Sequence, residues 1–413
     1  MDACTKSFQK TKYACYYTYL AMSSVFCLPP ILFVTFREMY GISYTLLGTL
    51  VLVNFLTQLA IDLVFTFFSR YFNIRNTIRI MPLLTSAGLL IYAFIPMIIP
   101  QHAYAGLLAG TVIFSVASGL CEVLLSPLIA ALPSDNTERD MSTLHSLYAW
   151  GVVSVIIIST VFLGIFGTKN WMYLTIILAL LPVVSFVLFC NSPMPETDIT
   201  HSVSRRRDKK KNLGILLFML CIFLGSSAEN AMTSWISVYM ESALHIPKTY
   251  GDIFGMALFA VLLGLGRTLY ARFGKNIFNV MLFGMIGAVI CYITAGISSV
   301  PLVCAFACVL TGLCTSMLWP GTLIFMEEKF PNPGITAYAL MAAGGDLGGS
   351  VAPQILGAVV DTVSQSSQGT KLGEMLSLSS EQIGIKAGML TAALYPILGV
   401  VLLLIIKKKL NKS

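Results

Sequence analysis

Charged residues are scarce in this sequence. Asp, Glu, Lys and Arg make up 11% of the 413 residues and hydrophobic residues make up 56%, whereas a soluble domain usually has about 25% charged and 45–50% apolar residues. So few charges cannot cover the surface of a water-soluble particle of this length. The composition therefore excludes an ordinary soluble domain and indicates a protein embedded in a lipid bilayer.

The sequence also lacks the short motifs of several large enzyme classes. It has no HExxH zinc site, no GxSxG nucleophile elbow and no GxxxxGK phosphate loop followed by Ser or Thr. Its ten cysteines lie in apolar stretches or close to the N-terminus, without the spacing or the His partners of a metal site. We therefore expect no enzyme activity, no metal and no cofactor, and we interpret the cysteines as packing residues.

Apolar runs of about 20 residues, long enough to cross a hydrocarbon core of about 30 Å, recur along the chain. They predict an all-α membrane protein with twelve spanning helices. The expected spans are residues 13–36, 44–68, 78–99, 105–131, 143–167, 171–190, 212–240, 250–271, 276–298, 301–326, 334–360 and 385–406.

Lys and Arg fall into two sets when these spans are threaded through a membrane. With the N-terminus inside, the cytoplasmic side, where such residues are retained, receives most of them. This side receives the basic clusters at residues 6–12, 70–79, 205–211 and 407–412, and the opposite side only Arg37, Lys169, Lys248, Lys371 and Lys386. We therefore expect a multi-pass protein of the cell (cytoplasmic) membrane with both termini in the cytoplasm. The net charge of +7 reflects this topology, and we expect no nucleic-acid partner.

The chain divides into two similar halves. Residues 191–211 are polar and basic, and we interpret them as a cytoplasmic linker between two six-helix bundles, residues 1–190 and 212–413. Residues 118–121 (Ser-Gly-Leu-Cys) match residues 311–314 (Thr-Gly-Leu-Cys), as parallel repeats would. Two pseudo-symmetric bundles leave a seam, and a transport site is expected there.

Several spans carry polar side chains at helical spacing. The sets are Asn54, Gln58, Asp62 and Thr66 on the second span, Ser115, Ser118, Glu122 and Ser126 on the fourth, and Ser226, Glu229, Asn230, Thr233 and Ser237 on the seventh. Each set shares one helical face. An ionisable group at mid-span costs roughly 2.5–3.5 kcal/mol, so we interpret the acids as functional. For the small polar residues, hydrogen bonding between helices is the alternative.

Two tryptophans and several helix breakers add to these faces. Trp235 and Trp319 lie near them and suit either the face of a sugar or core packing. Prolines and glycines predict interrupted spans, which in transporters point to the binding site. The predicted interruptions are Pro29, Pro30, Pro127 and Pro320 in spans one, four and ten. Span eleven is expected to be loosened by Gly344, Gly345, Gly348, Gly349 and Pro353.

At these residues the sequence resembles the major facilitator superfamily, and within it the fucose permease-like group of fucose, galactose and glucose proton symporters. The sharpest likeness is Gly119-Leu120-Cys121-Glu122 followed by Ser126-Pro127. The resemblance implies that Glu122 has the proton-linked role of that group's glutamate. The stretches at residues 145–151, 229–235 and 344–349 are also similar to the group.

The sequence departs from the group at several of these positions. Ser126 and Tyr148 replace asparagines, and the first span has no acid. In the loop after the second span, Arg70 and Asn73 stand where Asp and Gly are usual. These departures leave the solute and the coupling ion open, and only a gating role is carried over to the loop.

From these residues and the resemblance together, we expect proton-coupled import of a sugar or similar small polar solute by alternating access, in a monomer. The alternative is an efflux pump for drugs or metabolites. The candidate residues are Glu122, Asp346 and Asp62 for proton coupling; Glu122, Ser118, His145, Tyr148, Asn54, Gln58, Glu229, Asn230, Trp235 and Trp319 for the solute; and Arg267, Arg70 and Arg272 for gating. Arg267 is inside a span, and its expected partner is Glu122 or His145; otherwise it reaches the cytoplasmic interface alone.

Overall fold

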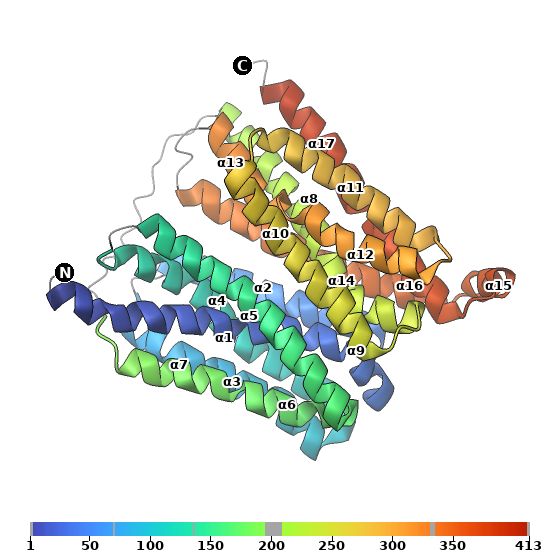
Figure 1. Cartoon of the computed structure of the whole chain (residues 1–413), viewed down its shortest axis with the longest axis horizontal. Coiled ribbons are helices and arrows are strands. Elements are labelled where there is room, and N and C mark those ends of the chain that lie inside the picture. The colour runs from blue at the N-terminus through green and yellow to red at the C-terminus, as the bar shows by residue number, and fades with distance from the viewer. Residues whose placement is uncertain (1–2, 69–70, 135–136, 195–208, 331–334, 411–413) are drawn as a thin grey trace. The chain divides into compact units, whose positions relative to one another are not determined.

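The protein is built from α-helices with short 3₁₀ and π-helical segments between some of them. The computed structural model describes residues 3–68, 71–134, 137–194, 209–330 and 335–410, and this part of the chain contains no β-strand (Figure 1). The elements are α1 Ala3–Tyr40, α2 Tyr44–Phe68, α3 Ile74–Ile98, η2 Pro100–His102, α4 Ala103–Ala131, α5 Thr137–Phe166, η3 Thr168–Asn170, α6 Trp171–Leu178, α7 Leu180–Cys190, α8 Lys209–Val238, η4 Tyr239–Ala243, α9 Lys248–Gly251, η5 Asp252–Ala257, α10 Leu258–Phe273, α11 Ile277–Ile297, α12 Pro301–Thr315, α13 Leu318–Lys329, α14 Ile335–Ser364, α15 Ser367–Leu376, α16 Ser380–Ala392 and α17 Leu394–Leu410.

Ten helical stretches of the described chain are long and apolar enough to cross a membrane. They are Phe8–Tyr40, Tyr44–Phe65, Ile74–Ile98, Pro100–Ser126, Thr168–Cys190, Leu213–Ala243, Lys248–Tyr270, Ile277–Ile297, Pro301–Lys329 and Ser380–Lys409. Two further helices, α5 and α14, have 30 residues each and occupy the places of the fifth and eleventh predicted spans. The predicted fold class, an all-α protein that crosses the membrane many times, is confirmed.

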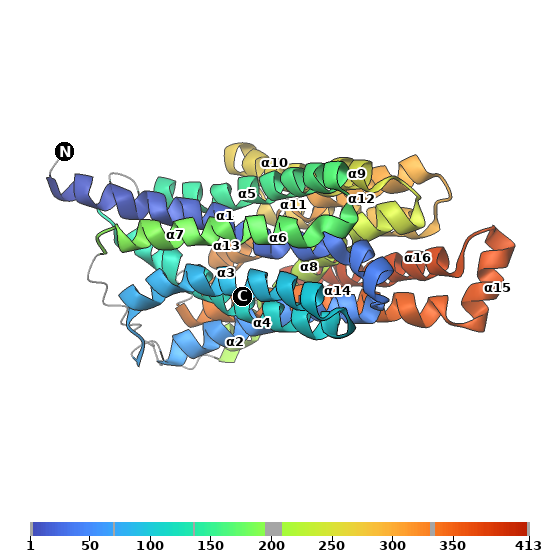
Figure 2. The same ribbon diagram turned by 90° about the horizontal axis from the view of Figure 1, so that it is seen from below.

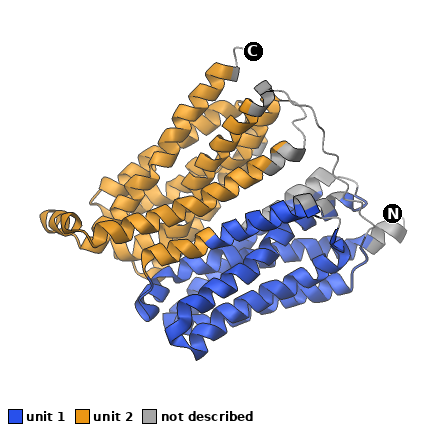
Figure 3. Ribbon diagram, turned by 180° about the vertical axis from the view of Figure 1, so that it is seen from behind, with its two compact units in different colours: residues 1–42, 53–200 blue, residues 43–52, 201–413 orange. Residues whose placement is uncertain are grey.

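The chain separates into two compact units (Figure 3). Unit 1 comprises residues 1–42 and 53–200, and unit 2 comprises residues 43–52 and 201–413. The first turns of α2 therefore belong to unit 2 and the rest of α2 to unit 1. The predicted linker, residues 191–211, lies largely outside the described residues, so the proposed boundaries at its two ends stay a prediction.

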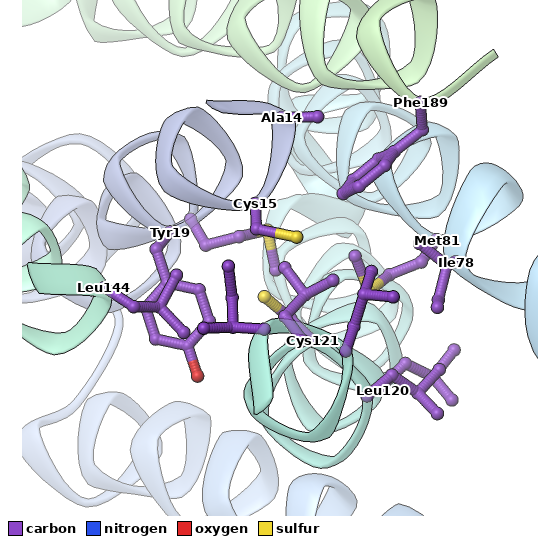
Figure 4. Close-up of a cluster of buried hydrophobic side chains, with 14 of the residues drawn as sticks. Ala14, Cys15, Tyr19, Ile78, Met81, Leu120, Cys121, Leu144 and Phe189 are labelled. Atoms are coloured by element: carbon purple, nitrogen blue, oxygen red, sulfur yellow. The ribbon is translucent and has the colours of Figure 1, made fainter. Parts of the chain in front are cut away.

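Unit 1 is packed around apolar side chains that come from several of its helices (Figure 4). α1 contributes Cys15 and Tyr19, α3 contributes Met81, α4 contributes Cys121, and α7 contributes Phe189. Cys15 and Cys121 are buried as free thiols. These two cysteines therefore act as the small packing residues that the sequence suggested.

Helix breakers interrupt fewer spans than predicted. α1 runs unbroken through Pro29 and Pro30, α4 runs through residue 127, and α14 runs through residues 344–349. The interruptions predicted at Pro29, Pro30 and Pro127 are wrong, and the glycines expected to loosen span eleven leave α14 continuous. A proline removes one backbone hydrogen bond, and the neighbouring turns of a long apolar helix keep theirs.

Glycines instead let α14 approach α8 closely within unit 2. A Cβ added at Gly344 would lie 2.8 Å from Met219 Cγ, and one added at Gly348 would overlap the Phe223 carbonyl oxygen. Both glycines are buried, and Asp346 between them in sequence is half-buried. The glycine-rich stretch therefore serves helix packing while it holds an acid within the bundle.

A carboxylate of α14 caps the first turn of α2 in unit 2. The backbone N–H groups of Tyr44 and Thr45 donate to the two Asp361 carboxylate oxygens at 3.2 and 2.6 Å. A negative charge at a helix N-terminus satisfies otherwise unbonded N–H groups and the helix dipole. The Tyr44 hydroxyl also donates to Glu381, and its ring lies 5.4 Å from the Trp235 ring, centroid to centroid.

Candidate functional site

The polar faces of the second and fourth spans meet in unit 1. Ser115 Oγ on α4 donates to Asn54 Oδ1 on α2 at 2.6 Å, and Gln58 Nε2 donates to the same oxygen at 3.0 Å. Asn54 and Gln58 are only 8% and 2% exposed. The predicted residues Asn54 and Gln58 are thus brought together, but they bond to each other and to Ser115. This is the helix–helix bonding that the sequence left as the alternative.

A glycine sets how closely these two helices approach. A Cβ added at Gly119 would lie 3.0 Å from Ile61 Cβ and 3.2 Å from Gln58 Cα, a fit that favours glycine. About one turn further along each helix, Asp62 on α2 and Glu122 on α4 lie within electrostatic range of each other. Asp62 is half-buried and Glu122 is exposed. Close packing of α2 on α4 therefore brings two carboxylates of membrane-spanning segments within electrostatic range.

Two serines of α4 flank Glu122 along the sequence. Ser118 is 3% exposed, and its hydroxyl has no hydrogen-bond partner among the described residues. Ser126, which replaces an asparagine of the similar group, lies 3.2 Å from the Tyr19 hydroxyl oxygen on α1. Hydroxyl groups are thus found on both sides of Glu122 along α4.

An aromatic group joins α1, α2 and α5 in unit 1. Tyr148 meets Phe26 edge to face at 5.7 Å between centroids, and Phe26 lies 6.2 Å from Phe55. All three side chains are half-buried. The sequence argument did not identify Phe26, because one phenylalanine in an apolar span carries no distinguishing signal. The His145 side chain and the whole of Arg70 lie outside the described part of the chain.

An ion pair joins α10 to α8 in unit 2. Arg267 Nη2 lies 3.3 Å from Glu229 Oε1, and Arg267 Nε donates to the Ser316 carbonyl at 3.1 Å. Ser316 follows Thr315, the last residue of α12, and precedes α13, which begins at Leu318. The interruption predicted for span ten is therefore confirmed. The Ser316 carbonyl in this gap accepts its hydrogen bond from Arg267. Such a bond is needed because backbone groups at membrane depth have no water to bond to.

The partner of Arg267 differs from the one expected. The predicted partners, Glu122 and His145, belong to unit 1, and the ion pair of Arg267 is with Glu229 of its own unit. The prediction is wrong because it used only the order of neighbouring helices and not the reach of the arginine side chain. Arg272 is exposed in the last turn of α10, with its guanidinium 5.3 Å from the Phe273 ring centroid.

Further polar contacts connect α8 to α14 near this ion pair. Ser226 Oγ donates to the Gly345 carbonyl at 2.6 Å, and Asn230 Nδ2 donates to the Ser226 carbonyl at 3.0 Å. The Trp319 indole packs against Gly345, where an added Cβ would overlap its Nε1. Asn230 and Trp319 are both half-buried. Two of the predicted solute-binding residues are therefore connected to Gly345, Trp319 directly and Asn230 through Ser226.

Trp235 has a packing role. Its side chain is fully buried, its Nε1 donates to the Pro353 carbonyl at 3.2 Å, and its ring lies beside Tyr44. Core packing, one of the two interpretations of this residue, fits these contacts.

No group of three or more His, Cys, Asp or Glu side chains within the described ranges is placed to hold a metal ion. Of the candidate acids, Asp62 lies within electrostatic range of Glu122, and Glu229 pairs with Arg267. What the described site offers is carboxylates, hydroxyls, amides and aromatic rings.

Comparison with known proteins adds to this geometry. A family model described as Major Facilitator Superfamily matches residues 16–353. No curated protein sequence matches the chain. Among solved structures, a bacterial homologue of the human lysosomal transporter Spinster is similar with a TM-score of 0.75 at 12% identity, covering 100% of this chain and 99% of that one.

Two proton symporters also share the fold. The D-xylose-proton symporter has a TM-score of 0.72 at 14% identity, with 94% of this chain and 97% of that chain covered. The fucose:proton symporter of E. coli has a TM-score of 0.60 at 13% identity, with 97% and 99% covered. At such low identities these likenesses show the fold alone.

Proposed function

This chain belongs to the major facilitator superfamily and is a membrane transporter rather than an enzyme, and we propose that it imports a sugar or similar small polar solute together with protons. Transport proceeds by alternating access. The observation that carries this proposal is the pair of carboxylates, Asp62 and Glu122, within electrostatic range on two membrane-spanning helices.

Proton coupling follows from the cost of placing two like charges together in a membrane. Two neighbouring carboxylates repel each other when both are ionised, and at membrane depth little solvent screens them. A proton shared by Asp62 and Glu122 relieves that repulsion. Its binding and release on the two sides of the membrane provide the driving force for import. Asp346 on α14 serves as a proton-carrying acid in unit 2.

The remaining charged groups are assigned to the solute and to gating. Arg267 provides an opposite charge for Glu229 at membrane depth. Glu229 and Asn230 then accept and donate hydrogen bonds to solute hydroxyls, and the flat ring of Trp319 packs against a sugar face. Opening and closing of the Arg267 ion pair accompanies the gating motion.

The names of two neighbours agree with this substrate class. The D-xylose-proton and fucose:proton symporters are named for a sugar and a proton. Other neighbours are named for nucleosides and peptides, which are also small polar solutes. The fold therefore supports transport of small solutes, and the choice of a sugar rests on the polar residues described above.

An efflux pump for drugs or metabolites is the second candidate. The half-buried rings of Phe26, Phe55 and Tyr148 favour it, because amphipathic drugs need apolar surface to bind. A cell that expresses the protein would then resist such compounds, whereas a sugar importer gives no resistance.

We also propose that the protein works as a monomer in the cell membrane, with both termini in the cytoplasm. Lys407, Lys408 and Lys409 in the last turn of α17 support this orientation, because basic residues are retained on the cytoplasmic side.

The test is uptake into proteoliposomes of labelled D-xylose, D-galactose and L-fucose, each offered in turn. For a sugar that the wild type accumulates under an inward proton gradient, Glu122→Gln should lower gradient-driven uptake by about tenfold or more. Exchange of labelled for unlabelled sugar without a gradient should continue, because it needs no net proton movement. Undiminished gradient-driven uptake by the variant would contradict the proposal.

A further inference from the structure

Helix α15 lies crosswise to the membrane-spanning helices on either side of it. It connects α14 to α16, and Figure 2 shows its axis running across the direction of both neighbours. The spanning helices define the membrane normal. A helix that crosses them at their end therefore lies in the plane of the membrane.

The lengths of the flanking helices place α15 at the membrane surface. α14 has 30 residues, and the stretch Ser380–Lys409 that follows α15 also has 30. At 1.5 Å per residue each measures about 45 Å, which matches a bilayer of roughly 40–45 Å including its headgroups. α15 begins at Ser367, shortly after α14 ends at Ser364, so it lies at the level of the headgroups.

One face of α15 is apolar and uncovered. Leu372, Met375 and Leu376 are 45%, 81% and 56% exposed. Their spacing of three and four residues places them on the same side of the helix. The buried residues of α15 are Gly369 and Gly373. Gly369 and Gly373 approach the carbonyl oxygens of Val363, at the end of α14, and Leu378, between α15 and α16, and these contacts leave Leu372, Met375 and Leu376 uncovered.

The charged residues of α15 complete an amphipathic pattern. Lys371 precedes Met375 by one turn, so its long side chain lies beside the apolar face and reaches lipid phosphates from there. Glu374 is two residues from both Leu372 and Leu376, which places it on the opposite side of the helix. An apolar face, a flanking lysine and an acid turned away are typical of helices that lie in the membrane interface.

We propose that α15 is an interfacial helix whose Leu372, Met375 and Leu376 side chains insert into the headgroup–acyl boundary of the bilayer. The occupant of the apolar face is lipid because α15 lies across the ends of membrane-spanning helices, at the level of the lipid headgroups (Figure 2). The adjoining membrane helices already expose apolar residues such as Ile355 and Leu390. The inserted helix anchors this end of unit 2 in the membrane surface, independently of the solute transported.

The experiment places an environment-sensitive fluorophore on each side of α15. Met375→Cys and Glu374→Cys are made in a Cys190→Ser background, since Cys190 is the exposed cysteine among the described ones. Each variant is labelled with a nitrobenzoxadiazole probe and reconstituted into phosphatidylcholine vesicles. Lipid-borne nitroxide should quench the probe at 375 at least about twofold more than the probe at 374, as expected for a face buried about 5–10 Å. Aqueous iodide should show the reverse order.

Three outcomes would overturn the proposal. Equal quenching of both probes by iodide means that the face is in water, and protection of position 375 from both quenchers means that protein covers it. Energy transfer between donor- and acceptor-labelled copies means that a second copy of the protein covers the face. Leu376→Cys on the same face provides a repeat if the Met375 variant does not retain the elution profile of the parent protein.

Discussion

Arg267 and Glu229 form an ion pair between α10 and α8, with Nη2 3.3 Å from Oε1 and 3.5 Å from Oε2. The arginine side chain is 43% exposed and the glutamate side chain 17%. Both residues lie in membrane-spanning stretches. A charged side chain at this depth is tolerated when an opposite charge lies beside it. Arg267 and Glu229 therefore each lower the cost of placing the other in the membrane.

Breaking this pair should destabilise unit 2. Glu229→Gln leaves the guanidinium with a weaker partner and should lower the free energy of unfolding by about 1–3 kcal/mol, toward the low end because Arg267 is partly exposed. Glu229→Gln combined with Arg267→Met should cost less than the sum of the two single changes. Thermal unfolding of the four proteins in detergent measures this, and strictly additive costs would show that the two residues are not coupled.

Packing of α14 on α8 predicts a large effect at a single glycine. Gly348→Ala places a methyl group against the Phe223 carbonyl oxygen, a backbone atom that cannot rotate away. We expect a loss of about 1–3 kcal/mol, as for other overpacked sites. Gly264→Ala in α10 is the matched control, because a Cβ there has no neighbour within 4 Å. The control should be neutral or more stable, since alanine favours helix. Equal melting temperatures for the two variants would argue against the close helix contact.

The cap on α2 predicts a graded response at Asp361. Asp361→Ala removes the acceptor for two backbone N–H groups and should cost about 0.5–2 kcal/mol. Asp361→Asn keeps a side-chain oxygen that accepts one of these hydrogen bonds, so its loss should be smaller. Melting temperatures of the two variants test the order, and a larger loss for the asparagine variant would contradict the capping role.

Asp140, in the first turn of α5 before the apolar part of that helix, predicts a pH dependence. Burial would raise its pKa, but the hydrogen bonds from Lys12 at 2.5 Å and Ser134 at 2.6 Å and the charge of Lys12 outweigh burial and lower it. Because the folded pKa lies below the unfolded value of about 3.9, the stabilisation is complete above that value. It is lost as the pH falls through the folded pKa.

The measurement compares melting temperatures of the wild type and Asp140→Asn across pH. The wild type should be more stable at neutral pH, and the difference should begin to shrink near about pH 4 and disappear once the pH has fallen below the folded pKa. Lys12→Met should produce a similar loss at neutral pH, because it removes the other half of the pair. A difference that persists unchanged in acid would show that the charge of Asp140 is not the source of the stability.

The sequence predicted the features that depend on one helix at a time. Each span is a local run of apolar residues, so its place follows from hydropathy alone. The regular spacing of Asn54, Gln58 and Asp62 placed them on one face. In the structure Asn54 accepts hydrogen bonds from Ser115 of α4 and from Gln58. The break in span ten was likewise signalled locally, by Pro320.

Features that depend on how helices rotate against each other were not predictable. Trp235 and Trp319 looked equivalent in sequence, but Trp235 is enclosed by Tyr44 and Pro353 while Trp319 remains half-buried. The partner of Arg267 depends on the reach of a long side chain across to α8. α1 continues through Pro29 and Pro30 because the turns on either side keep their hydrogen bonds. The presence of the two prolines does not by itself show whether a helix continues.

Proton movement itself tests the central claim most directly. Proteoliposomes containing the wild-type protein and a pH-sensitive dye in the lumen are given an outside pulse of a transported sugar, with no proton gradient imposed. Coupled import through Asp62 and Glu122 predicts that the lumen acidifies when the sugar is added, and that Glu122→Gln abolishes the acidification while sugar still enters. Sugar entry by the wild type with no change in lumen pH would contradict the account.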